Sequence, residues 1–167
     1  MLVIALSVLT LPLPRRLASF IPSAQAASST IVISQFQVAG GTAADEFVEL
    51  HNVGSSAFDL NGHRLVYRSA AGTSDVNVVT WTASAVIPAG GYYLLAHSTG
   101  YDGAAAANAT FNTGATGTFA AAGGGLAVRH VASNAVVDSV GYGTATNAFV
   151  ETAVTAVPAA NDSRART

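Results

Sequence analysis

Short runs in which apolar and polar residues alternate fill most of the chain after residue 28. In the run HRLVYRS, Leu65 and Tyr67 fall on one face of an extended segment, whereas Arg64, Val66 and Arg68 fall on the other. The pattern predicts seven strands, at residues 30–38, 46–52, 63–69, 77–82, 91–97, 125–131 and 135–142. No window of helical length combines apolar spacing of three and four residues with good capping. We therefore predict an all-β sandwich or barrel.

Turn-forming residues separate the predicted strands. Asn61-Gly62 lies between FDL and HRL, and because both residues tolerate positive φ, the pair predicts a β-hairpin. Asp59, just before this turn, is placed to accept hydrogen bonds from turn amides. Residues 98–122 have a weak strand signal, and we expect them to form a long surface loop.

The first 26 residues have the pattern of a secretory signal peptide. An apolar run at residues 2–13 is followed by Ala-Gln-Ala at 24–26, so we predict cleavage between Ala26 and Ala27. The run is too short to span a membrane as a helix. Arg15 and Arg16 follow the apolar run, which leaves an upstream start or a twin-arginine signal as alternatives. We expect a secreted or cell-envelope protein with no stable membrane span after cleavage.

Composition and charge exclude several classes of protein. The chain of 167 residues has no cysteine, which excludes disulfides and thiolate metal sites. All seven basic residues are arginine, and removal of residues 1–26 leaves five of them against nine acids. Direct binding of nucleic acid requires a dense basic patch and is not expected.

Three segments together resemble the lamin tail domain: EFVELHNVGSSAFDLNGHRLVY (46–67), VIPAGGYYLLAH (86–97) and GGGLAVRHVASNAVVDSVGYG (123–143). The resemblance covers about residues 30–147 and implies an immunoglobulin-like β-sandwich of the bacterial exported type. It predicts one domain at residues 27–160, followed by a C-terminal end at residues 161–167. The alternative is that the chain is truncated at this end. His63 stands where the family commonly has tryptophan, so we expect a less filled core edge there.

Carboxylates cluster in the segment DEFVEL, and a catalytic pair or a metal site has to be considered there. Strand alternation puts Phe47 and Glu49 on one face and Glu46 on the other, so Glu46 and Glu49 do not converge on one substrate. We expect these acids to form a solvated strand edge. A cation site combining Asp45, Glu46 or Glu49 with Asp102 is the alternative, although no calcium-binding loop motif is present.

Other candidate chemistry is weak. The four histidines, His51, His63, His97 and His130, lack the close spacing of a zinc site. No Gly-x-Ser-x-Gly elbow is present, and Asp138-Ser139 lies inside a predicted strand. A glycan platform built from Trp81, Tyr92, Tyr93 and Tyr101 is an alternative to core packing, although alternation separates Tyr92 from Tyr93. We expect no catalytic residues, no metal and no cofactor.

These observations favour a non-catalytic extracellular binding or structural module. Its partner would be a protein, a wall polymer or a glycan, and the edge of the FVEL strand could add a partner strand. The alternative is an accessory domain or fragment of a larger secreted nuclease or phosphatase-type hydrolase, because the resemblance implies that such modules accompany those enzymes. A small calcium-dependent enzyme is a third option.

Overall fold

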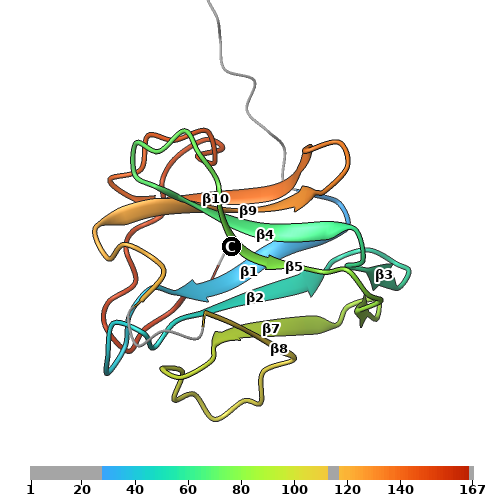
Figure 1. The fold of residues 1–167 in the computed structure, drawn as a ribbon, viewed down its shortest axis with the longest axis horizontal. Coiled ribbons are helices and arrows are strands. Elements are labelled where there is room, and N and C mark those ends of the chain that lie inside the picture. Colours follow the sequence, from blue (N-terminus) through green and yellow to red (C-terminus); the bar gives the residue numbers. More distant parts are fainter. Residues whose placement is uncertain (1–27, 113–116, 166–167) are drawn as a thin grey trace, which may run out of the picture.

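The computed structural model describes residues 28–112 and 117–165, which form a two-layer β-sandwich (Figure 1). Its strands are β1 (Ile31–Gln37), β2 (Phe47–Asn52), β3 (Phe58–Asp59), β4 (His63–Ser69), β5 (Val76–Thr80), β6 (Val86–Ile87), β7 (Tyr92–His97), β8 (Ala109–Phe111), β9 (Gly123–His130), β10 (Val136–Gly143) and β11 (Arg164–Ala165). One sheet has the order β11-β1-β2-β7-β8, and the other has the order β10-β9-β4-β5. A short pair, β3-β6, lies at one end. The predicted all-β sandwich is confirmed.

The core forms because alternate side chains of both sheets face inward. On β4, Leu65 and Tyr67 enter the main core, and Val66 on the other face enters a second, smaller cluster with Ala127 and Phe149. The main core takes its remaining buried side chains from the other strands and their connections: Ile31, Ile33, Phe36, Val38, Val48, Leu50, Leu60, Trp81, Ile87, Leu95, Phe111, Phe119, Leu126, Val128, Val140 and Tyr142.

A buried carboxylate joins the two sheets at the edge where β1 meets β10. Asp138 of β10 is fully buried, and it accepts a hydrogen bond from the backbone N–H of Ile33 at 2.8 Å. The pairing of β1 with β2 shifts register between Ile33 and Gln35, so this N–H lies at an irregular point of the ladder. Asp138 therefore satisfies a backbone donor at the point where the register of β1 changes.

All seven predicted strands are present, within two residues at either end. The predicted hairpin at Asn61-Gly62 is wrong, because β3 pairs with β6 whereas β4 pairs with β5 and β9. Only Gly62 has positive φ (79°), and the N–H of His63 donates to the C=O of Leu60. This is a turn that carries the chain from the small pair into the four-stranded sheet.

Two further expectations about edges and loops need correction. The FVEL strand, β2, lies between β1 and β7, so its backbone is paired on both sides and cannot add a partner strand. The loop predicted at 98–122 contains β8, which pairs in parallel with β7 and forms the other edge of that sheet.

The segment after β10 covers one side of the sandwich. Thr155 bridges to Tyr142 of β10, and β11 pairs with β1 at Gln35 and Phe36. The segment from Thr144 to Ala165 thus contacts β10, an edge strand of one sheet, and supplies β11, an edge strand of the other.

The described residues include no helix that is long and apolar enough to cross a membrane. The predicted signal peptide and the Ala26-Ala27 cleavage site lie outside the described residues.

Candidate binding site

Two of the three carboxylates of the DEFVEL segment, Asp45 and Glu46, are buried and form structural hydrogen bonds. Glu46 is fully buried, and its side chain accepts hydrogen bonds from the N–H of Thr118 (2.8 Å) and of Phe119 (2.6 Å). Burial raises the pKa of Glu46 from 4.5 to about 7, although these two backbone donors oppose the shift. Asp45 is only 2% exposed and accepts from the N–H of Gly41 at 3.3 Å. The expected solvated strand edge is therefore wrong for Asp45 and Glu46.

The structure separates Glu46 from Glu49, as the alternation predicted. Glu46 is buried just before β2 begins, whereas Glu49 faces outward from β2 and accepts from the hydroxyl of Ser34 at 2.7 Å. The N–H of Asp102 lies 3.4 Å from Asp45 Oδ1, which brings the loop acid near the strand. Residues 28–112 and 117–165 nevertheless contain no group of three or more His, Asp or Glu side chains placed to hold a metal ion.

Asp59 has the turn-capping role that its position predicted. Its carboxylate accepts from the N–H of Asn61 (2.9 Å) and of Ala85 (2.9 Å) and from the hydroxyl of Ser84 (2.8 Å). The backbone donors of Asn61 and Ala85 lower the pKa of this carboxyl.

Another acidic side chain organises the outer face of the four-stranded sheet. Asp75 lies within ion-pair distance of Arg64 (3.4 Å), Arg68 (2.7 Å) and Arg129 (2.5 Å), which project from β4 and β9. Burial acts to raise the pKa of Asp75, but the hydrogen bonds and charges of Arg68 and Arg129 outweigh it and lower the pKa. Arg68 also lies over the ring of Phe149, 4.5 Å from its centroid.

Two of the four histidines lie side by side. His63 of β4 pairs across the sheet with His130 of β9, and their ring centroids are 5.2 Å apart. His51 stacks on Tyr92 (4.3 Å between centroids), and His97 is buried with Nδ1 accepting from the N–H of Gly100. The sequence predicts scattered histidines, and His63 with His130 is the exception.

The four aromatic residues considered as a glycan platform do not share one surface. Trp81 is buried and packs edge-on against Tyr93, whereas Tyr101 packs against Phe47. Tyr92 is 57% exposed and stacks on His51.

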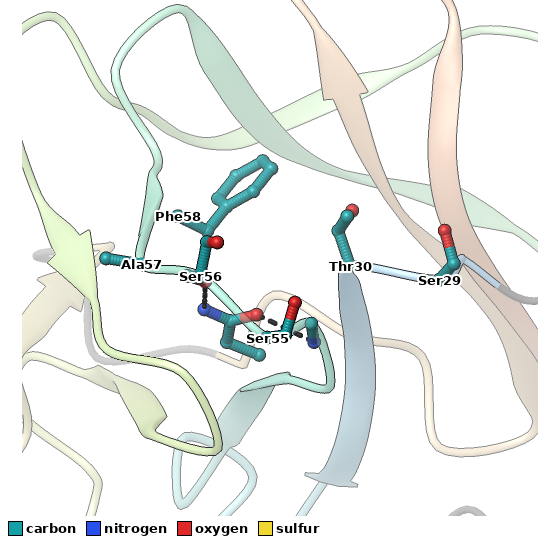
Figure 2. Close-up of a pocket in the computed structure, with 8 residues that line it drawn as sticks. Ser29, Thr30, Ser55, Ser56, Ala57 and Phe58 are labelled. Carbon is teal, nitrogen blue, oxygen red and sulfur yellow. Dashed lines mark hydrogen bonds between the residues drawn. The ribbon is translucent and has the colours of Figure 1, made fainter.

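A pocket of about 250 Å³ opens at the end of the sandwich that carries β3. Figure 2 shows Ser29 and Thr30 on one side of it and the segment 55–58 on the other. Its lining is rich in hydroxyl groups: Ser29, Thr30, Asn52, Gly54, Ser55, Ser56, Ala57 and Phe58. We call it the hydroxyl pocket.

Asn52 lines the hydroxyl pocket and makes its side-chain hydrogen bonds within the protein. Its side-chain amide donates to the C=O of Ser56 and of Ile87, both at 2.9 Å, and its oxygen accepts from the N–H of Gly54 at 3.0 Å. Asn52 is fully buried and the hydrogen bonds of its side-chain amide are made within the protein, so the polar groups that face the pocket are serine and threonine hydroxyls. The Thr30 hydroxyl also lies 3.1 Å from the hydroxyl of Ser28.

Comparison with protein-family models matches residues 24–144 to the lamin tail domain. The chain belongs to the lamin tail domain family. A search among curated proteins finds no match. In this lamin tail domain the matched region ends just after β10 and contains the hydroxyl pocket, the two paired histidines and all the arginines around Asp75.

The segment beyond the matched region is nevertheless packed onto the lamin tail domain. Phe149 is 1% exposed and completes the outer cluster with Val66 and Ala127. Asn147 donates to the C=O of Ser69 at 3.0 Å and accepts from the N–H of Phe149 at 2.9 Å.

The sequence alone indicates neither the hydroxyl pocket nor the histidine pair. The pocket forms where residues 29–30 meet residues 52–58, and the histidines are likewise far apart in sequence. The available signal is strand alternation: His63 shares a face with Leu65, and His130 shares a face with Val128. Only the register between β4 and β9 places the two histidines opposite each other.

Proposed function

We propose that this lamin tail domain is exported and acts outside the cytoplasm as a non-catalytic binding module. The proposal rests on the structural role of the carboxylates. Glu46, Asp59, Asp75 and Asp138 each accept hydrogen bonds that hold strands and turns together. General acid–base chemistry requires such groups to converge on a substrate instead.

The hydroxyl pocket supports a ligand recognised by hydrogen bonding. Ser29, Thr30, Ser55 and Ser56 are exposed at its rim, and each hydroxyl can both donate and accept. The ring of Phe58 gives the same pocket an apolar wall, as sugar rings require. We propose that the partner is a glycan or wall polymer, or a protein that presents similar polar groups.

Sedimentation with insoluble wall polymer tests the proposed binding function. We expect the purified chain to co-sediment with the polymer, and Ser55→Leu together with Thr30→Leu to reduce the bound fraction, because leucine removes the hydroxyls and fills the pocket. Ser74→Leu, exposed elsewhere, is the matched control and retains binding. Equal binding by all three proteins would show that the pocket is not the contact.

The export proposal has its own test. Amino-terminal sequencing of the protein recovered from outside the cytoplasm should begin at Ala27. Recovery of the chain inside the cell with residues 1–26 intact would contradict it. Turnover of phosphodiester or phosphomonoester substrates by the purified chain would favour the hydrolase alternative.

A further inference from the structure

The pair formed by His63 and His130 has the backbone arrangement that brings two side chains closest in an antiparallel sheet. The residues are direct partners in the β4–β9 ladder. The N–H of Val131 donates to the C=O of Gly62 at 2.8 Å, so the bond flanks the pair and does not join its two members. Such non-hydrogen-bonded pairs have the shortest separation between side chains.

Both rings are half-buried and lie at the end of the sandwich that carries β3. They project from the core-facing side of their strands, where the ring of Phe58 packs on His63 at 5.1 Å between centroids. Phe58 also lines the hydroxyl pocket, so the histidine pair and the pocket adjoin at one end of the domain.

Turn residues orient each imidazole through its Nδ1 atom. His63 Nδ1 lies 3.2 Å from the C=O of Asn61, an acceptor, so the proton of the neutral ring is placed on Nδ1. His130 Nδ1 lies 3.3 Å from the hydroxyl of Ser133, which can either donate or accept, and 3.4 Å from the backbone N–H of Ser133, which donates. A protonated Nδ1 leaves the Nε2 lone pair of His63 for a ligand. His130 presents the same lone pair when its Nδ1 is protonated and donates to the Ser133 hydroxyl in place of accepting from the Ser133 N–H.

The separation of the rings suits a shared metal ion. An ion about 2.0–2.1 Å from an imidazole nitrogen lies roughly 3 Å from the ring centre, so two rings in tetrahedral arrangement have centres about 5 Å apart. The observed separation is 5.2 Å, with an angle of 87° between the ring planes. We propose that His63 and His130 bind one divalent transition-metal ion at this end of the domain.

The ligand set defines the class of metal. Two neutral imidazoles favour copper or zinc over magnesium and calcium, which take oxygen ligands. Solvent completes the coordination, since the described residues supply no third His, Asp or Glu ligand. The ionised carboxylate of Asp59, which interacts electrostatically with His63, adds a favourable negative charge nearby. Among divalent ions, Cu²⁺ should bind more tightly than Zn²⁺.

Titration of the untagged, chelator-treated full chain with Cu²⁺ and Zn²⁺ tests this site. We expect one saturable site, tighter for Cu²⁺, with an electron paramagnetic resonance spectrum that shows two coordinated imidazole nitrogens. His63→Gln and His130→Gln should each weaken Cu²⁺ affinity by about tenfold or more, since even outer-shell changes cost this much. His51→Gln is the matched control and should bind as the unmodified chain does.

A second measurement needs no variant. Zn²⁺ should protect His63 and His130 of the unmodified chain from diethylpyrocarbonate, as read by mass spectrometry, and should leave His51 reactive. Unchanged Cu²⁺ affinity in a folded variant that carries both His63→Gln and His130→Gln, or no selective protection of the pair, would overturn the proposal. Its failure would leave the proposed binding function standing, because the sedimentation test uses the hydroxyl pocket alone.

Discussion

At the scale of the residue, two fully buried carboxylates each accept hydrogen bonds from backbone amides that are distant in sequence. Glu46 holds the amides of Thr118 and Phe119, and Asp138 holds the amide of Ile33. A buried amide without an acceptor is costly, so these side chains act as parts of the backbone hydrogen-bond network.

Replacement of Asp138 by alanine should lower the free energy of unfolding by about 2–3 kcal/mol, since it leaves the buried N–H of Ile33 without its acceptor. Asp138→Asn keeps one acceptor oxygen and should cost less. Urea unfolding followed by tryptophan fluorescence measures both, because Trp81 lies in the same core. Asp162→Ala, at an exposed position, is the control; equal losses for Asp138 and Asp162 would refute the role of burial.

The raised pKa of Glu46 predicts a dependence of stability on pH. Between pH 4.5 and about 7 the folded state keeps the Glu46 proton that the unfolded state has lost, so stability falls as pH rises. The loss should total about 3 kcal/mol, at about 1.4 kcal/mol for each pH unit, and level off above pH 7.

Unfolding curves for the unmodified chain and for Glu46→Gln across this pH range provide the measurement. The free energy of unfolding of the unmodified chain should fall relative to that of Glu46→Gln as the pH rises through this range. The reason is that the glutamine side chain of the variant has no proton to lose. Glu49→Gln on β2 faces outward and should leave the slope as it is. Identical slopes in the unmodified chain and the Glu46 variant would contradict the prediction.

At the scale of the element, strand β5 is held to the sheet partly by charge. Asp75 directly precedes β5 and contacts arginines of β4 and β9, so it ties three strands together on the outer face. Three arginines without this carboxylate would repel one another in a half-buried place.

Asp75→Ala should therefore destabilise the domain by about 2 kcal/mol, between the values typical of exposed and of buried ion pairs. The effect should be partly reversed in a background that also carries Arg68→Met, because fewer unpaired charges remain. A double-mutant cycle by thermal unfolding measures this coupling. Strictly additive losses would show that the pair does not interact energetically.

The sequence predicted the long strands because alternation is visible over five or more residues. It missed β3, β6, β8 and β11, since two or three residues cannot display a period, and their pairing depends on neighbours distant in sequence. The hairpin at Asn61-Gly62 was wrongly predicted because the residues of a turn do not determine which sheet the next strand joins. Glu46 was expected in solvent because its burial requires a loop some 70 residues away.

At the scale of the whole molecule, the segment that follows the family-matched region completes the sandwich. Phe149 covers Val66 and Ala127 on the outer face of the four-stranded sheet, and two arginines cover Phe149 in turn. The described residues after β10 are therefore packed on the sandwich, up to the pairing of β11 with β1.

Phe149→Ala should cost about 3–5 kcal/mol, as expected for truncation of a fully buried aromatic side chain. Tyr92→Ala, at a ring that is 57% exposed, is the control and should cost far less. Denaturant unfolding gives both values. A loss below that of Tyr92→Ala would mean that the segment after β10 is not part of the cooperative unit.

The placement of β11 has a mechanical consequence. It runs antiparallel to β1 and is joined to it at only two residue pairs, so the chain enters at Ser28 and leaves at Ala165 toward the same end of that pair. Tension applied between these points would peel β11 away one bond at a time instead of shearing several bonds at once. A domain anchored at both ends would thus yield first at this short strand, at low force, and the central strands would stay paired while the tether lengthens.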